Sequence, residues 1–386
     1  MKKIMILGGS EAQLPAILKA KELGYLTFNV DMYDDAFCKG YADEFENIST
    51  LDFDGLCEAI EKHKPDGIMT IASDRPVPIL AKLAEKYGFI AVNTESATKA
   101  TNKYLMRETF NKTGVAIPRF SKITCIEELY KNIDAIGFPA ILKPVDSSGS
   151  RGISYIDINT DLENAYNYSK AAANSGTLLL EEYMIGEEYS VESFTEKGET
   201  VICAITEKST TGKPHFIETG HVVPAELDYE KTLKIKELVL KAHKALKVNC
   251  GPSHTEVMYT ESGPKIVEIG LRMGGDCISS FLVPLATSID LVGLTIKQAL
   301  GDSFEIGEDI HKSACIRFIL NSQSKNIRGI DMSGVKCVHY YVDKSKLNKQ
   351  LNSSADRIGY VICSGENHDQ SVEKAESALN DIKFIY

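Results

Sequence analysis

Short apolar runs alternate with amphipathic stretches along the first hundred residues. Three apolar runs, at 3–9, 26–31 and 66–72, have the length and composition of buried strands. The stretches between and after them repeat apolar residues at helical spacing, and glycines close several of the turns. Strands that alternate with helices in this way are typical of a parallel sheet. The pattern therefore predicts an α/β domain at the start of the chain.

The pattern becomes mixed after this start. A predicted helix over 101–117 ends at Gly114, and a second predicted helix over 160–173 has Thr160 as its N-cap. The other expected elements are two strands around a polar glycine loop within 138–158, several strands between 177 and 223, a helix near 229–246, strands at 253–260 and 264–270, helices near 277–300, and strands with a closing helix near 369–382. The chain is therefore predicted to continue as an α+β structure.

Composition and charge narrow the class of protein. A length of 386 residues suggests two or three domains, and 43% hydrophobic with 25% charged residues is typical of a soluble globular protein. The formal net charge of −11 argues against nucleic acid or an anionic membrane as the main partner. The cysteines form no CxxC pair, and the apolar run after Lys3 is too short for a signal or a membrane span. We therefore expect a cytoplasmic protein.

Common nucleotide-binding and nucleophile motifs are weak or missing in the sequence. The segment ILGGSEAQLPA resembles a dinucleotide-binding loop, with Asp31 near the ribose position, but it lacks the third glycine of GxGxxG. A tight strand-to-helix turn is the simpler interpretation. The sequence contains no GxxxxGK[ST] loop and no GxSxG motif, which excludes a Walker-type site and the usual serine-nucleophile turn.

Charged residues in the middle of the chain stand where apolar strands end. Lys143 closes the stretch FPAILK, just before the polar loop DSSGSRG at 146–152. A solvated lysine and a mobile hairpin tip are the ordinary explanations, but a lysine beside a glycine loop can also bind phosphate. Glu181 and Glu182 end a later apolar strand, and Met184 follows them. Such carboxylates are usually solvated, but this strand edge can instead pair with a flat base.

Glu256 and Glu268 lie on consecutive predicted strands around a turn at Gly263. If these strands pair as a hairpin, the two carboxylates reach the same side of it. Two ionised carboxylates about 4 Å apart repel each other by roughly 4 kcal/mol at an effective dielectric constant near 20. A divalent cation removes that cost, and oxygen ligands without histidine or cysteine favour Mg²⁺ or Mn²⁺.

The order of these features resembles the ATP-grasp superfamily, and the resemblance extends over residues 1–300. It rests on a lysine on a helix, a lysine on a strand, a glycine loop, a Glu-Glu-Tyr-Met segment, two strand glutamates and an arginine. It implies an ATP-grasp fold of α/β and α+β elements. A Rossmann-like domain would precede it at 1–98, the ATP-grasp domain would occupy 99–300 with a mobile lid subdomain near 115–184, and a small α+β domain would follow at 301–386.

The resemblance implies roles around the nucleotide phosphates. Lys103 and Lys143 correspond to the two lysines that bind the phosphates. Arg272 corresponds to the arginine that meets the reacting phosphate and acyl oxygens. The loop that closes over the phosphates corresponds to Ser147, Ser148, Gly149, Ser150 and Gly152.

The resemblance also implies base, ribose and metal contacts. These correspond to Glu181 for the adenine amine, Glu182 and Met184 for backbone contacts to the ring, Glu188 for the ribose, and Glu256 and Glu268 for the metal. One position departs from the family pattern, because Gly270 stands where many members carry a metal-ligating asparagine. We expect water or Asp276 to complete the coordination shell of a second metal ion, so that one or two Mg²⁺ (or Mn²⁺) ions accompany ATP.

ATP-grasp members are mostly carboxylate–amine ligases, so the resemblance implies an enzyme that forms C–N bonds and releases ADP and phosphate through an acyl phosphate. The segments at 218–227 and 270–291 look most like the branch that joins amino acids or other small carboxylates to amines, which includes dipeptide ligases. In that branch Glu218 and His221 would serve the amine. The backbone of Gly274 and Gly275, with Arg272, would serve an anionic substrate group.

Two alternatives share the same fold. A purine-pathway or carboxyphosphate-forming ligase has a similar domain plan. A non-catalytic ATP-binding regulatory protein is the other, although such a protein would be expected to lose the metal carboxylates or the arginine. The expected partners are small-molecule carboxylate and amine substrates, with neither nucleic acid nor a membrane, and homodimers are common among family members.

Overall fold

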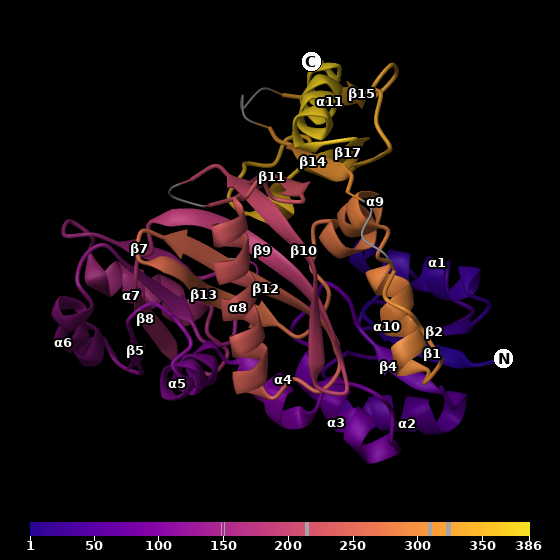
Figure 1. Ribbon diagram of the computed structural model, residues 1–386, viewed down its shortest axis with the longest axis horizontal. Helices are drawn as coiled ribbons and strands as arrows, with labels where there is room; N and C mark the ends of the chain where they lie inside the picture. The colour runs from indigo at the N-terminus through magenta and orange to yellow at the C-terminus, as the bar shows by residue number, and fades with distance from the viewer. Residues whose placement is uncertain (148, 150, 213–215, 308–310, 322–325) are drawn as a thin grey trace.

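The computed structural model describes residues 1–386 except 148, 150, 213–215, 308–310 and 322–325 (Figure 1). Its strands form a four-stranded parallel sheet near the N-terminus, a four-stranded antiparallel sheet, and an eight-stranded antiparallel sheet that continues into the C-terminal part. A two-stranded pair of β15 (Gly329–Asp331) and β18 (Lys383–Ile385) lies at the C-terminal end. The arrangement confirms the predicted α/β start and α+β remainder.

The N-terminal sheet has the strand order β3-β2-β1-β4, and all neighbours are parallel. Along β1, Ile4 and Ile6 pack in the core that contains α1, whereas Met5 and Leu7 pack in the core of α2 and α3. In the sequence, a strand that is buried on both faces appears as a continuous run of apolar residues. The elements are β1 (Lys3–Leu7), α1 (Leu14–Glu22), β2 (Leu26–Asp31), β3 (Glu44–Asn47), α2 (Phe53–His63), β4 (Gly67–Met69) and α3 (Val77–Tyr87).

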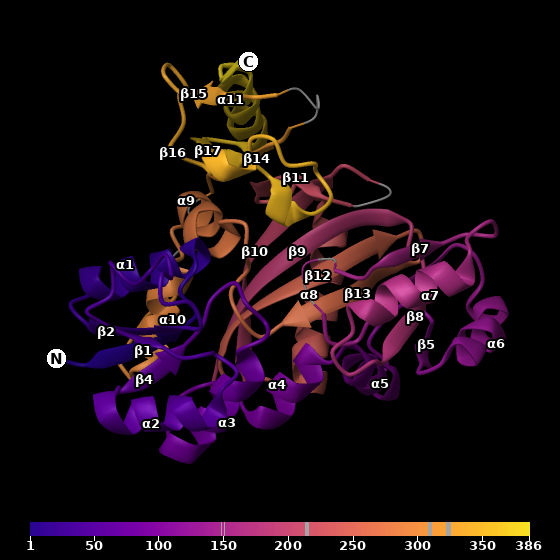
Figure 2. The ribbon, with the colours of Figure 1, turned by 180° about the vertical axis from the view of Figure 1, so that it is seen from behind.

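A helix from far along the chain completes this first domain. α10 (Leu291–Ala299) packs against α1 and β4, and its Ile296 joins the same apolar cluster as Ile4. Both views show α10 beside the N-terminal strands (Figures 1 and 2). Among the described residues no single helix is long and apolar enough to cross a membrane. One bent pair, Ile278–Thr287 with Leu291–Ala299, passes by length and composition only, and most of its residues are buried.

The small antiparallel sheet has the order β5-β8-β6-β7 and carries α6 and α7. Leu129 and Ile133 of α6 pack with Leu142 and Leu180 of the strands in one apolar cluster. The elements are β5 (Phe120–Ile123), α6 (Ile126–Ile136), β6 (Ala140–Pro144), β7 (Ser154–Ile156), α7 (Leu162–Ala171) and β8 (Leu178–Glu182). The segment of β5 and α6 has no counterpart among the predicted elements.

The large sheet has the order β13-β12-β9-β10-β11-β14-β17-β16, so strands of the middle and of the C-terminal part form one continuous ladder. α8 packs on it through Ile235 and Val239, which share a cluster with Val191 and Val257. The elements are β9 (Gly186–Glu196), β10 (Glu199–Thr210), β11 (Glu218–Val223), α8 (Tyr229–Leu246), β12 (Gly251–Thr260), β13 (Gly263–Gly270), α9 (Val283–Thr287), β14 (Ser313–Ile319), β16 (His339–Val342), β17 (Gly359–Gly365) and α11 (His368–Asn380).

Two local predictions are wrong. The helix expected over 101–117 is instead α4 (Thr94–Thr101) and α5 (Lys103–Thr113), because extended Asn102 separates them and caps α5 through its side chain. α5 does end at Gly114, as predicted, with a φ of +67°. The N-cap of α7 is Asp161 rather than Thr160, since the Asp161 carboxylate accepts from two backbone N–H groups of the first turn.

The glycine turn after β1 has a structural partner in Asp31. The Asp31 carboxylate accepts a hydrogen bond from the Gly9 backbone N–H at 2.7 Å. Gly8 has a φ of +96°, which glycine adopts without a steric penalty. This contact agrees with the interpretation of the motif as a tight strand-to-helix turn.

Candidate active site

Glu256 on β12 and Glu268 on β13 stand directly opposite each other in the antiparallel pair. Opposed residues project from the same face of a hairpin, so the two carboxylates lie on one side, as the sequence predicted. The hairpin turn ends at Gly263, whose φ of +104° favours glycine. The donor set consists of carboxylate oxygens only, which fits Mg²⁺ better than a softer metal.

Each of these two carboxylates already has a lysine partner. Lys103 Nζ lies 2.7 Å from Oε1 of Glu268 and donates to the Ser147 carbonyl oxygen at 2.7 Å. Lys208 Nζ lies 3.1 Å from Oε1 of Glu256 and 2.6 Å from Oε1 of Glu188. Each of the two carboxylates therefore already neutralises the charge of a lysine. A bound metal ion requires the same negative charge from its ligands.

Lys208 on β10 is a further charged residue of this site, and the sequence pattern did not predict it. Burial alone lowers the pKa of this lysine, but Glu256 and Glu188 raise it above its usual value. The pKa of Glu256 is held well below its usual value by Lys208 and His254, against the opposing effect of burial. Lys208 looked like the polar end of an ordinary strand, and only the register across β12, β9 and β10 brings it to Glu256.

A buried triad joins α5 to the small sheet. Lys143 Nζ lies 2.6 Å from Oε2 of Glu181, and Arg107 Nε lies 2.5 Å from Oε1 of the same carboxylate. Burial alone would raise the pKa of Glu181, but the two cations hold it at about 2. Burial, with Arg107 and Lys103 nearby, lowers the pKa of Lys143 even though Glu181 opposes this. A single carboxylate cannot fully neutralise the positive charge of two cations.

Some of the predicted nucleotide and metal residues line one cavity of about 780 Å³ between the small and the large sheet, whereas Lys103, Ser147 and Glu268 do not line it. Those that line it are Lys143, Gly149, Glu181, Glu182, Met184, Glu188 and Glu256. Gly152 is buried, and a Cβ there would lie 2.5 Å from the Ala172 Cβ, so this position of the loop requires glycine. Ser148 and Ser150 lie outside the described residues. The individual base, ribose and phosphate roles stay predictions.

Arg272 follows β13 and reaches the N-terminal domain. Its Nη2 lies 2.8 Å from Oδ2 of Asp74, in the loop after β4. Burial alone would raise the pKa of Asp74, but Arg272 holds it below its usual value. The Nε of Arg272 is buried and has no partner among the described residues, and Arg272 lines neither the nucleotide cavity nor the cavity beside Asp276. Asp74 was missed, although a carboxylate just after a parallel strand stands where ligand sites of α/β sheets gather.

Asp276, which with water was one of the two expected ligands of a second metal ion, lines the cavity beside Arg357 and not the cavity that Glu256 lines. Its two oxygens accept from the Arg357 guanidinium at 2.5 and 2.8 Å, and His221 Nε2 lies 3.2 Å from Oδ2. Burial alone would raise the pKa of Asp276, but His221 and Arg357 hold it far below its usual value. Asp276 is therefore occupied by an arginine and a histidine.

Two expected substrate contacts also need correction. His221 is only 1% exposed and lines neither the nucleotide cavity nor the cavity beside Asp276, so in this structure it acts on Asp276 rather than on a substrate. The Gly274 N–H already donates to Oε2 of Glu192 at 3.2 Å. Gly275 keeps open space around its Cα, whereas Glu218 lines the nucleotide cavity and accepts a hydrogen bond from Ser354.

Comparison with known proteins agrees with this arrangement. Residues 136–280 match the ATP-grasp domain, and residues 325–386 match the L-amino acid ligase C-terminal domain 2. The chain belongs to the ATP-grasp superfamily. The matching relatives include an alanine–anticapsin ligase, and an L-amino acid ligase is among the solved structures that share the fold.

Relatives of the chain fall into two functional groups. The formate-dependent phosphoribosylglycinamide formyltransferase of Methanococcus maripaludis is 32% identical over 199 residues, which cover 51% of this chain and 51% of that protein. The alanine–anticapsin ligase of Bacillus subtilis is 28% identical over 253 residues, which cover 60% of this chain and 52% of that protein. The chain thus spans about half the length of these two curated relatives.

Solved structures show the same fold over the whole chain. An L-amino acid ligase from Bacillus licheniformis has a TM-score of 0.85 at 19% identity, with coverage of 100% of this chain and 99% of that chain. A phosphoribosylglycinamide synthetase from Anaerococcus prevotii has a TM-score of 0.81 at 23% identity, with coverage of 100% and 99%. Identities this low establish the shared ATP-grasp fold and leave the substrates open.

Proposed function

We propose that this ATP-grasp ligase joins a small carboxylate, an amino acid or a related acid, to an amine. The reaction passes through an acyl phosphate and releases ADP and phosphate. The observation that carries the proposal is the opposed pair of Glu256 and Glu268, with Glu256 lining the same cavity as Lys143. The L-amino acid ligase match of residues 325–386 supports the amino acid branch. A cytoplasmic location fits nine cysteines that are all free thiols.

The lysines that bind the phosphates in this proposal are paired with carboxylates in the structure. Lys143 and Lys103 transfer from Glu181 and Glu268 to the phosphate oxygens of ATP, which offer equivalent charge-assisted hydrogen bonds. Glu256 and Glu268 are the residues that hold Mg²⁺ (or Mn²⁺) beside these phosphates. When bound, the ion neutralises charge on the phosphates and makes the γ-phosphorus a better electrophile.

Bond formation needs no protein nucleophile, in agreement with the absence of a GxSxG motif from the sequence. A substrate carboxylate oxygen attacks the γ-phosphorus, and the bond between this phosphorus and ADP breaks. The amine nitrogen then attacks the acyl carbon, the bond from this carbon to the phosphate oxygen breaks, and the amine proton leaves to solvent. Arg272 stabilises the acyl and phosphate oxygens through its planar donors, of which Nε is unpartnered among the described residues.

A purine-pathway ligase is the second candidate. The phosphoribosylglycinamide formyltransferase of Prochlorococcus marinus is 25% identical over 405 residues, which cover 100% of this chain and 98% of that protein. This candidate requires a site for a phosphoribosyl group, whereas the amino acid branch requires a site for a small acid. The chemistry of the substrate cavity therefore distinguishes the two.

A substrate matrix tests the proposed reaction. The purified protein is incubated with ATP, Mg²⁺ and pairs of amino acids or small carboxylates with amines, and nucleotide, phosphate and product masses are recorded. We expect ADP and phosphate in equal amounts, with a product mass equal to the sum of the two substrates minus water. Release of AMP and pyrophosphate would mean an adenylating mechanism and would overturn the proposal.

The change Glu268→Gln tests the carboxylate pair. It keeps the shape of the side chain but removes the charge that holds the metal and pairs with Lys103. We expect turnover to fall on the order of 100-fold or more, because a metal supplies several kcal/mol of transition-state stabilisation. The matched control is Glu261→Gln, an exposed residue in the turn of the same hairpin. Equal activity of the two variants, with both folded by circular dichroism, would show that the metal assignment is wrong.

A further inference from the structure

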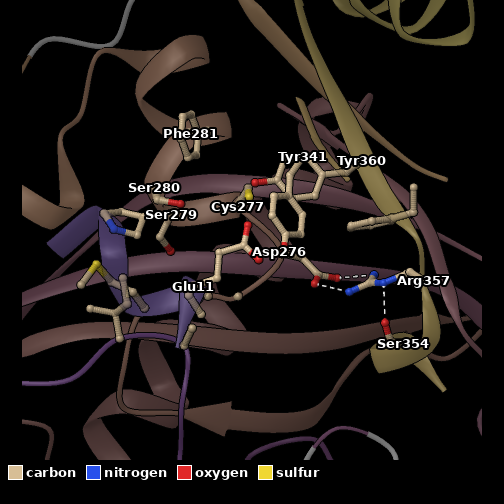
Figure 3. A pocket seen from close by; sticks show the side chains of 18 of the residues that line it. Glu11, Asp276, Cys277, Ser279, Ser280, Phe281, Tyr341, Ser354, Arg357 and Tyr360 are labelled. Atoms are coloured by element: carbon tan, nitrogen blue, oxygen red, sulfur yellow. Dashed lines mark hydrogen bonds and ion pairs between the residues drawn. The ribbon is translucent and has the colours of Figure 1, made fainter. Parts of the chain in front are cut away.

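A second cavity, of about 210 Å³, lies beside the glycines that follow β13 (Figure 3). Much of its lining comes from the turn after β1 with Glu11, the segment from Met273 to Phe281, and the C-terminal strands with Tyr341 and Tyr360. Ser354 lines both this cavity and the nucleotide cavity, so the two are neighbours. A substrate held here lies next to the site at which ATP reacts.

The two cations that line the second cavity are already paired. Arg357 contacts both oxygens of Asp276 (Figure 3). Its guanidinium carbon lies 3.6 Å from the centre of the Phe318 ring. Lys346 Nζ lies 3.5 Å from Oδ2 of Asp343. An anion entering the cavity would have to displace Asp276 or Asp343 from these cations, and a phosphate group would also meet the carboxylate of Glu11.

Glu11 differs from the other charged groups of the cavity because it has no ion-pair partner. In the described part of the chain no cationic nitrogen lies within 4.0 Å of its carboxylate. The carboxylate is half-buried and accepts from the Tyr341 hydroxyl, and burial raises its pKa although Tyr341 and Lys346 oppose this. A carboxylate withdrawn from water in this way is stabilised by a positively charged ligand.

The rest of the cavity suits a slender, partly apolar ligand. Phe281, Pro15 and Val292 supply apolar surface on several sides, and Ile71 lies on the N-terminal side. These groups can cover an aliphatic chain, while Glu11 meets the charge at its end.

We propose that the second cavity binds the side chain of a basic amino acid, with Glu11 as the residue that selects the positive charge. This inference rests on the proposed ligase function and names the substrate class of that site. The basic amino acid serves either as the carboxylate substrate or as the amine, and in both cases its side-chain cation contacts Glu11. The same charge arrangement disfavours a phosphoribosyl substrate.

Binding measurements test the inference without requiring turnover. L-lysine and L-norleucine have similar aliphatic chains and differ in the terminal ammonium group, so calorimetric titration of both isolates the charge. We expect L-lysine to bind at least tenfold more tightly to the native protein, and Glu11→Gln to abolish that ratio. Glu22→Gln, on the exposed side of the neighbouring helix α1, is the matched control and should keep it. Glu11→Ala, checked for folding by circular dichroism, should lose the ratio as well.

Three results would overturn the inference: equal affinity for L-lysine and L-norleucine, a ratio that survives Glu11→Gln, or tighter binding of ribose 5-phosphate than of L-lysine. The turnover assay separates this outcome from failure of the proposed function. ADP release with neutral amino acids, without a preference for basic ones, would leave the ligase proposal intact and reject the cavity assignment. Binding of L-lysine that depends on Glu11, without ADP release for any pair, would reject the ligase and keep the cavity assignment. Product masses from L-lysine paired with other acids or amines show which substrate it is.

Discussion

Gly270 shows how one missing side chain can define a site. A Cβ at this position would lie 2.7 Å from Oδ1 of Asp74 and 3.1 Å from the guanidinium carbon of Arg272. The glycine therefore makes room for the ion pair between Asp74 and Arg272. Gly270 departs from the family pattern, in which many members carry a metal-ligating asparagine at this position. The structure gives a physical reason why no asparagine stands here. Here a second domain supplies a carboxylate at the same place.

Gly270→Asn should reduce activity rather than restore a metal ligand. The new side chain displaces Asp74, so Arg272 loses its position and kcat/KM falls, while forced overpacking lowers the free energy of unfolding by about 1–3 kcal/mol. Steady-state kinetics and urea unfolding measure the two effects. Gly40→Ala is the control, since a Cβ there has nothing within 4 Å. An asparagine variant with higher activity and tighter metal binding would contradict this account.

At the scale of elements, the triad of Arg107, Lys143 and Glu181 ties α5 to β6 and β8. Although burial alone would raise the pKa of Glu181, Arg107 and Lys143 lower it in the folded state to about 2 from its ordinary value of 4.5. A lowered carboxyl pKa contributes stability that is present above 4.5 and is lost as the pH falls toward 2, because the unfolded state then binds more protons.

Glu181→Gln should therefore be less stable than the native protein near neutral pH, by about 3–5 kcal/mol, because two buried cations lose their carboxylate. Urea unfolding at a series of pH values checks this, and the difference should shrink between pH 4.5 and 2 as native Glu181 takes up its proton. Glu163→Gln, exposed in the first turn of α7, should follow the native protein at every pH. A difference that does not change with pH would reject the triad as the source of the effect.

Local patterns were enough to predict those elements and site residues whose neighbours are close in sequence. The hairpin around Gly263 has a short turn that the sequence indicates, but a β-bulge between Glu256 and Val257 shifts the register, and this shift places Glu256 opposite Glu268. Lys208 and Asp74 reach the site through strand order and domain packing, which leave no periodic signal in their own segments. β3, with the sequence Glu-Phe-Glu-Asn at a sheet edge, has too little apolar pattern to be recognised.

Across the whole molecule, the order of motifs predicted the superfamily, but the way the parts join was not predictable. α10 returns to the N-terminal core, so residues on both sides of the predicted boundary at 98 share one apolar cluster. The boundary expected at residue 300 falls between strands of one sheet, since β11 pairs with β14. Contacts between such distant segments depend on tertiary packing, and no sequence window contains both partners. The domain boundaries stay predictions.

The pairing of β11 with β14 has a consequence for solubility. A chain that ends at residue 300 leaves the unpaired backbone of Gly220–Val223 as a sheet edge, with apolar Val222 and Val223 beside it. Such an edge is a template for pairing with another chain, so we expect this shortened chain to self-associate in light scattering while the full chain does not. The change Val222→Lys in the shortened chain should reduce the association, because a charged side chain at a sheet edge disfavours pairing with the strand of another chain. A shortened chain that stays monodisperse would show that the C-terminal strands are dispensable; otherwise they protect the ligase from aggregation as well as completing its second cavity.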